Sequence, residues 1–263
     1  MKTVKGLHEK MGTFENANTS FHQAARCKRY TNEVLAFSMV KEEELLRATE
    51  EIQNLTYRQG EYKIFKVFEP KERLIMALPF YDRVVQHMIC NAIQPVFENG
   101  FYYHSYACRS GKGMHAASDT LYQWMYETEV KQGLRMYAFK GDISKYFASI
   151  PHDKLKDENR HYIGDKKALM LMDDIIDHNG ILPDGVGIPV GNLTSQLFAN
   201  VYGNKLDKFC KHVLHIPYFV RYMDDFIILS DDLEQLKEWV KRIEEFLENE
   251  MLLHINPKST ILY

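Results

Sequence analysis

The sequence predicts an α+β fold in which helices back an antiparallel sheet. With 263 residues, of which 45% are hydrophobic, the chain can bury a substantial core in one large domain or two closely packed ones. From residue 136 onward, patterned segments follow in the order strand, helices, hairpin, helix, strand. This order is typical of the ferredoxin-like arrangement.

The first 135 residues are predicted to be mainly helical, with one hairpin. Residues 34–54 have the periodicity and the Glu, Leu and Ala content of a helix. The apolar runs 62–68 and 74–77 surround Glu69-Pro70-Lys71-Glu72, which predicts two strands joined by a tight turn. Pro79 then opens a helix that runs to about residue 97, and another helix is expected over 114–130.

The second half of the chain supplies the sheet. An apolar strand over 136–143 carries Asp142 near its end, and a hairpin is expected over 216–230. The remaining elements are helices over 151–178, 192–213 and 233–250, and a short strand over 252–255. In such a sheet the end of the first strand can lie beside the hairpin tip, which brings Asp142 to the hairpin turn.

That turn, Tyr222-Met223-Asp224-Asp225, holds two adjacent carboxylates between apolar runs. Like charges in one site raise each other's pKa, and a divalent cation relieves the repulsion. Together with Asp142 they suit a site for two Mg²⁺ or Mn²⁺ ions, because oxygen ligands favour these metals and paired ions catalyse in-line phosphoryl transfer. The alternative for Asp142 is a strand-end carboxylate that caps a helix beginning near Ser144.

Composition indicates the setting of the protein. A net charge of −3 does not by itself indicate a nucleic-acid-binding protein. The four cysteines lie far apart without CxxC spacing, which argues against a zinc site or a disulfide framework and favours a reducing cytoplasm. No charged-then-apolar leader opens the chain, and no apolar run approaches the roughly 18 residues of a membrane helix, so no membrane association is expected.

From about Lys63 to Leu262 the chain resembles reverse transcriptases of the bacterial and group II intron branch. The matching motifs come in the family's order, at 71–75 with 79–86, 105–113, 139–147, 188–196, 221–225 and 256–259. The resemblance implies a right-hand polymerase fold with fingers and a ferredoxin-like palm. It implies an N-terminal helical extension (1–60), fingers (61–135) and palm (136–263), with about 151–190 contributed to the fingers. The chain stops just after the sixth motif, so the primer grip and thumb are expected to be absent.

The resemblance also assigns catalytic roles. Asp142, Asp224 and Asp225 match the metal ligands, and the carbonyl of Ile143 can assist them. Lys258 matches the lysine that protonates the pyrophosphate leaving group, with an ordinary surface lysine as the alternative.

Three further residues match positions that handle the incoming nucleotide. Arg109 and Lys112 lie on a glycine-containing loop and match the residues that grip the triphosphate, and the alternative is a pair of solvated loop charges. Phe147 matches the bulky gate that rejects a ribose 2′-OH. Its alternative is a core aromatic that follows a strand, and the two roles are compatible.

The segment 188–196 is the most discriminating one, since most reverse transcriptases have Gln-Gly-x-x-x-Ser-Pro there. This chain has Val190 and Gln196 at the ends of that pattern, around Gly191 and Ser195. The four residues are expected to shape the pocket of the nascent base pair. The pattern resembles the error-prone enzymes of diversity-generating retroelements, which work with a small basic accessory protein. The alternative is a neutral core variant in another bacterial group.

The function implied is RNA-directed DNA synthesis from an RNA template, a primer and dNTPs. Within that class the alternatives are the enzyme of a group II intron, a retron, a CRISPR-linked system or a phage-defence system. From other classes come a thumbless, noncatalytic nucleic-acid-binding remnant and a nucleotide cyclase on a similar sheet. The cyclase does not explain the fingers motifs.

Overall fold

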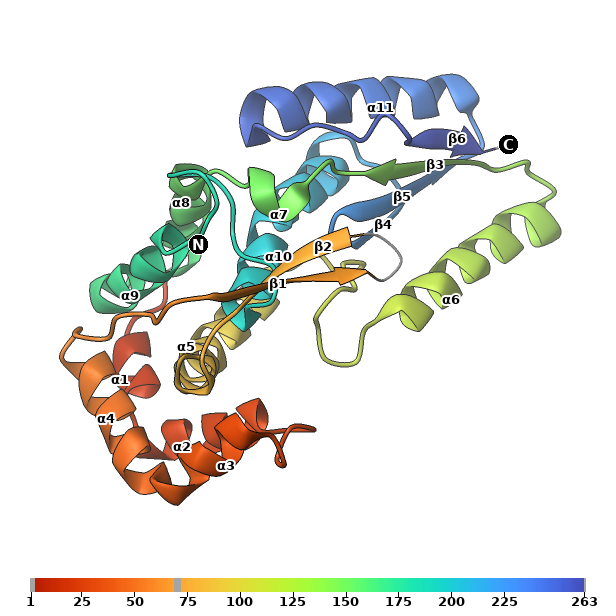
Figure 1. The fold of residues 1–263 in the computed structure, drawn as a ribbon. Helices are drawn as coiled ribbons and strands as arrows, with labels where there is room; N and C mark the ends of the chain where they lie inside the picture. The colour runs from red at the N-terminus through yellow and green to blue at the C-terminus, as the bar shows by residue number, and fades with distance from the viewer. Residues whose placement is uncertain (1–2, 69–71, 263) are drawn as a thin grey trace. The chain divides into compact units, whose positions relative to one another are not determined.

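The computed structural model describes residues 3–68 and 72–262 (Figure 1). The chain divides into two compact units. The first unit comprises Met1–Gly100 and His152–Phe198, and the second comprises Phe101–Pro151 and Ala199–Tyr263. The predicted turn at 69–71 lies outside the described residues. None of the helices in 3–68 and 72–262 is long and apolar enough to cross a membrane.

The first unit is mainly helical. Its helices are α1 (Leu7–Met11), α2 (Phe14–Ala24), α3 (Asn32–Met39), α4 (Lys41–Gln53), α5 (Phe80–Glu98), α8 (His152–Tyr162) and α9 (Lys166–Asp177). Asp165 orders the start of two of them, because its carboxylate accepts the N–H groups of Lys167 and Ala168 in α9 and of Leu7 and His8 in α1. Burial alone raises the pKa of Asp165, but these hydrogen bonds outweigh burial and lower it.

The single helix predicted over 34–54 is in fact two helices. Val40 leaves the helical region (φ −122°, ψ 27°) and separates α3 from α4. Three glutamates, Glu42 to Glu44, occupy the first turn of α4, where their charge favours a new helix N-terminus. The segment predicted to be helical over 151–178 consists of α8 and α9, separated at Gly164 and the N-cap Asp165.

The predicted hairpin is confirmed as β1 (Lys63–Phe68) and β2 (Glu72–Ala77), which pair antiparallel from Lys63↔Ala77 to Phe68↔Glu72. The N–H of Met76 in β2 donates to the carbonyl of Val190 at 3.0 Å. The hairpin therefore holds the segment that precedes α10 (Leu193–Lys208).

The second unit is built on an antiparallel sheet in the order β4-β5-β3-β6 (Figure 1). Its strands are β3 (Tyr137–Asp142), β4 (Tyr218–Tyr222), β5 (Asp225–Ser230) and β6 (Thr260–Leu262). The predicted strand over 252–255 is wrong, since Ile255 forms only an isolated bridge to Ile143. The apolar residues there end a helix instead: Leu252 adopts a left-handed conformation (φ 53°), and Leu253 packs into the core.

Helices lie on both faces of this sheet. Helix α11 (Leu233–Phe246) packs on β3 and β5, and its buried face consists of Leu236, Trp239 and Ile243. Helix α6 (Met114–Met125) packs on β4 with Ala117, Leu121 and Trp124 close to Val220 and Ile227. Val220 and Ile227 are opposed across β4 and β5 and share the face of Asp225, because side chains alternate along a strand.

Candidate active site

The sheet register places the predicted carboxylates together. Asp142 at the end of β3 lies directly opposite Asp225 at the start of β5, so the two side chains share one face. The backbone N–H of Ile143 donates to the carbonyl of Asp224 at 3.1 Å. This bond places Asp224, the third predicted carboxylate residue, beside the same end of β3. Asp142 and the adjacent pair Asp224-Asp225, more than 80 positions apart in the sequence, thus meet at one end of the sheet.

The turn that carries the two aspartates is tight. Tyr222 pairs with Asp225, which leaves only Met223 and Asp224 in the loop between β4 and β5. Met223 adopts a left-handed conformation (φ 60°), and its side chain is buried, at 8% exposure. A non-glycine residue in this conformation costs about 1–2 kcal/mol, so other contacts must hold the turn.

Asp142 is fixed by the loop between Ile255 and β6. The side-chain amide of Asn256 donates to Oδ2 of Asp142 at 2.6 Å, and the N–H of Asp142 donates to Oγ of Ser259 at 3.1 Å. Lys258 is exposed on the same loop, and its N–H donates to Oδ1 of Asn256 at 3.1 Å. These bonds do not support the alternative role of Asp142 as a helix cap.

The donor set fits a hard divalent cation, although the side chains do not form a closed cage. Asp142 and Asp225 lie on the same face as opposed strand partners, and carboxylate oxygens are the ligands that Mg²⁺ and Mn²⁺ prefer. Among residues 3–68 and 72–262, no three His, Cys, Asp or Glu side chains are already grouped as a metal site.

Arg109 and Lys112 lie on the loop before α6, as predicted. Nη1 of Arg109 donates to the carbonyls of Tyr102 and Ser105, both at 2.8 Å. Nζ of Lys112 donates to the carbonyl of Tyr103 at 3.0 Å and lies 3.5 Å from the centre of that ring. Both cations thus stabilise the loop itself while lying half-buried at its surface.

Phe147 follows β3 on the short helix α7 (Tyr146–Ser149). Its ring is half-buried, whereas that of Tyr146 is fully buried and donates its hydroxyl hydrogen to the carbonyl of Ala199 at 2.7 Å. Tyr146 is therefore the core aromatic of this pair, which leaves Phe147 partly open to solvent.

The four residues predicted to shape the nascent-pair pocket lie in the first unit. Ser195 is buried, and Val190 and Gln196 are half-buried. Gly191 has φ 123°, and a Cβ there would lie 3.0 Å from the carbonyl oxygen of Met76, so this position requires glycine.

The buried polar network that supports this segment was not predicted from the sequence. Nδ2 of Asn192 donates to the hydroxyl of Tyr62 at 2.8 Å, and Oε1 of Gln86 accepts the N–H of Leu193 at the start of α10. Burial raises the pKa of Tyr62 to about 12, against the opposing hydrogen bonds from Asn192 and Gln59.

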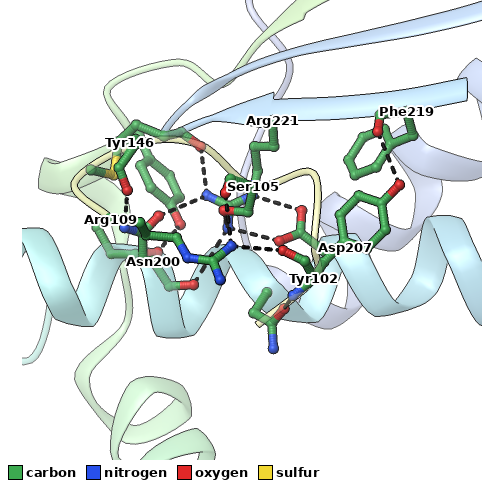
Figure 2. Close-up of polar contacts among 12 residues, drawn as sticks. Tyr102, Ser105, Arg109, Tyr146, Asn200, Asp207, Phe219 and Arg221 are labelled. Atoms are coloured by element: carbon green, nitrogen blue, oxygen red, sulfur yellow. Dashed lines mark hydrogen bonds and ion pairs between the residues drawn. The ribbon is translucent and has the colours of Figure 1, made fainter. Parts of the chain in front are cut away.

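A second unpredicted feature is Arg221, which is fully buried and donates to the carbonyl of Met223 in the aspartate turn. Figure 2 shows Arg221 with Asp207 and Ser105. Its guanidinium pairs with Asp207 of α10 through Nε–Oδ1 at 2.7 Å and Nη2–Oδ2 at 2.8 Å. The sequence signal was an arginine inside the apolar strand Tyr218–Tyr222, where a charge must have a buried partner.

The family model described as reverse transcriptase (RNA-dependent DNA polymerase) matches residues 66–263. The chain belongs to the reverse transcriptase family. This reverse transcriptase is similar to protein YkfC of Escherichia coli K12, with 28% identity over 134 residues. It is also similar to two fungal proteins: the 91 kDa protein in the cob intron of Schizosaccharomyces pombe (29% over 137 residues) and a COX1/OXI3 intron 2 protein of Saccharomyces cerevisiae (23% over 137 residues).

The curated relatives are longer proteins. The matches cover 49–50% of this reverse transcriptase but only 34%, 16% and 15% of YkfC, the cob-intron protein and the COX1/OXI3 protein. The chain therefore matches about one third of YkfC and a smaller share of each fungal protein.

Solved telomerase structures share the fold of this reverse transcriptase. Apo telomerase from Candida tropicalis, truncated from its C-terminal domain, aligns with a TM-score of 0.56 at 14% identity, over 84% of this chain and 55% of that one. Telomerase from Candida albicans, solved with a fragment of telomeric RNA, aligns with a TM-score of 0.57 at 10% identity, over 80% of this chain and 44% of that one. These likenesses confirm the predicted polymerase fold.

Proposed function

We propose that this protein is an RNA-directed DNA polymerase that extends a primer along an RNA template with dNTPs. One observation carries the proposal: Asp142 and Asp225 are opposed strand partners, and Asp224 lies in the adjoining two-residue turn. Family membership supports the same activity. The telomerase relative solved with RNA supports an RNA template as partner.

Each residue in the proposed site has a definite task. Asp142, Asp224, Asp225 and the carbonyl of Ile143 would hold two Mg²⁺ or Mn²⁺ ions, which when bound activate the primer hydroxyl and stabilise the leaving oxygen. Arg109 and Lys112 bind the triphosphate through charge-assisted hydrogen bonds. Phe147 excludes a 2′-OH by its volume. Lys258, exposed two residues after Asn256, donates a proton to the pyrophosphate.

The domain assignment accompanies this proposal: residues 1–60 form an N-terminal extension, 61–135 the fingers, and 136–263 the palm with 151–190 contributed to the fingers. Support for the last point comes from His152–Phe198, which groups with the first unit and not with the sheet. A reducing, cytoplasmic location is proposed from the four free cysteines.

Primer extension on an RNA template with the full-length protein and Mg²⁺ tests the activity. Asp224→Ala should abolish nucleotide addition because it removes a proposed metal ligand, and the circular dichroism spectrum checks that the variant is folded. Asp231→Ala, which removes an exposed aspartate of the second unit, is the matched control and should retain synthesis. Mg²⁺-dependent synthesis by Asp224→Ala would contradict the assignment, and RNA binding without synthesis by the wild type would favour the noncatalytic remnant.

We also propose a narrower role, as the error-prone enzyme of a diversity-generating retroelement with a small basic accessory protein. Val190 and Gln196 support it, since they replace polar and proline positions beside the nascent pair. A group II intron enzyme fits equally well, because two fungal relatives are named as intron proteins. Sequencing the cDNA made on one RNA separates the two, since errors concentrated at template adenines favour the retroelement.

A further inference from the structure

The second unit contains a buried ion pair between Arg221 and Asp207, and the burial of two charges is not explained by packing alone. Arg221 and Asp207 are both 0% exposed, although charged residues are seldom fully buried. Desolvating an ion pair costs several kcal/mol per ion, so such a pair is weak evidence for stability. Burial alone would lower the pKa of Arg221, but the Asp207 carboxylate outweighs burial and raises it, so Arg221 stays charged.

The guanidinium uses all five of its N–H donors. Besides Asp207, Nη1 donates to the carbonyl of Met223 at 3.0 Å and to Oδ1 of Asn200 at 3.3 Å. Nη2 donates to Oγ of Ser105 at 3.1 Å. Figure 2 shows Arg221 at the centre of these bonds, between α10 and the loop that carries Ser105.

The bond to Met223 matters most, because it reaches the strained residue directly before Asp224. Arg221 pairs with Phe226 across the sheet, so its side chain lies on the face opposite Asp225. From that face, Nη1 of Arg221 donates to the carbonyl of Met223 in the turn. The left-handed conformation of Met223 is thereby stabilised by a charged donor that is itself fixed by Asp207.

The same network reaches the loop of Arg109. The N–H of Arg221 donates to the carbonyl of His104, and its carbonyl accepts the N–H of Tyr106, so Ser105 lies beside β4. The carbonyl of Ser105 in turn accepts Nη1 of Arg109 at 2.8 Å. Helix α10 makes room for this arrangement at Gly203, where a Cβ would lie 2.6 Å from Nη1 of Arg221.

We propose that Arg221 is a positioning residue that fixes the Asp224-Asp225 turn relative to the loop that carries Arg109. The inference rests on the proposed function for its catalytic consequence, whereas the positioning itself can be measured without catalysis. Residues that orient metal ligands typically change metal affinity or activity by about 10–100-fold when they are lost.

The test is the double variant Arg221→Met/Asp207→Leu in the full-length protein. Replacing a buried ion pair by apolar residues of similar volume is often neutral or stabilising, so the fold should survive while the bond to Met223 is lost. The matched control is Arg160→Met/Asp173→Leu, which makes the same chemical change at a partly exposed pair of the first unit.

Two readouts do not depend on turnover: Mn²⁺ affinity by electron paramagnetic resonance, and amide hydrogen exchange over 222–225. We expect the double variant to bind Mn²⁺ about 10–100-fold more weakly and to exchange the turn amides faster, with the control unchanged. A folded double variant with wild-type affinity and exchange would overturn the proposal.

Two single variants decide the matter if the double variant does not fold. Arg221→Lys keeps the charge but loses the planar guanidinium. Gly203→Ala keeps Arg221 and displaces its guanidinium, together with the hydroxyl of Tyr146, which the new Cβ would approach to 2.9 Å. Both should weaken Mn²⁺ binding, and wild-type values in both would reject the positioning role. If the wild type itself makes no cDNA, the proposed function fails, while these measurements still decide the role of Arg221.

Discussion

Arg221 and Asp225 lie only four positions apart, yet they occupy opposite faces of the sheet, since the two-residue turn reverses the chain between them. Asp142 and Asp225 lie on one face of the sheet. The guanidinium of Arg221 lies on the other face and donates to the carbonyl of Met223 in the turn. Roles at this scale follow from which face a side chain occupies, because neighbouring residues of a strand point to opposite sides.

Phe147 supplies a prediction of this kind. Phe147→Ala should lower the preference for dNTPs over NTPs by about tenfold or more, because each 1.4 kcal/mol of lost discrimination is a factor of ten. The ratio of kcat/KM for a dNTP and the matching NTP measures this. Tyr146→Phe, which removes only the hydroxyl bonded to Ala199, is the control and should keep the ratio. An unchanged ratio in a folded Phe147→Ala would reduce Phe147 to a packing residue.

Val190 tests the proposed fidelity role. Val190→Gln should lower misincorporation opposite template adenine more than opposite other bases, since one buried hydrogen bond of about 1.4 kcal/mol gives a tenfold change in selectivity. The backbone contact of Val190 with Met76 is retained in the variant. Sequenced cDNA from both enzymes on one RNA is the measurement, with Val186→Gln in the same loop as control. Equal error spectra would remove the physical basis for a mutagenic segment.

At the scale of elements, the position of β3 depends on close packing at Gly141, the residue before Asp142. Gly141 lies opposite Phe226, and a Cβ at Gly141 would come within 2.3 Å of that ring, which is itself flanked by Phe139 and Phe219. The strand can approach the aromatic layer only because residue 141 has no side chain.

Gly141→Ala should therefore lower the free energy of unfolding by about 1–3 kcal/mol, the usual cost of overpacking, which exceeds the entropic gain of removing a glycine. Urea unfolding monitored by circular dichroism measures it. Phe226→Leu in the Gly141→Ala background should recover part of the loss, because the smaller side chain gives up the space that Cβ needs. Additive losses in the double variant would show that the clash does not set the cost.

At the scale of the whole molecule, stability should depend on pH through His104. Burial, reinforced by Lys112 and Lys211, lowers the pKa of His104 to about 4, well below the value of about 6.5 in an unfolded chain. Between those two values the unfolded chain binds a proton that the folded chain does not, so stability is full above pH 6.5 and falls as the pH drops toward 4.

His104→Gln should flatten that fall, whereas His212→Gln at an exposed site should not. The measurement is the slope of the unfolding free energy against pH between 4 and 6.5, from urea melts. An identical slope in His104→Gln and the wild type would contradict the assignment.

The sequence by itself determined the elements and most of the candidate site. Alternating and helical patterns are local, so the hairpins, strand β3 and the helices from residue 80 onward could be predicted. The carboxylates stood out because adjacent like charges in an apolar turn repel each other unless a cation is bound. The break at Val40 and the last strand were missed, because apolar residues of a helix end resemble a short strand. Only the tertiary structure decided the register that opposes Asp142 and Asp225, and the partners of Arg221. Both depend on contacts between segments far apart in the chain, which no local pattern records.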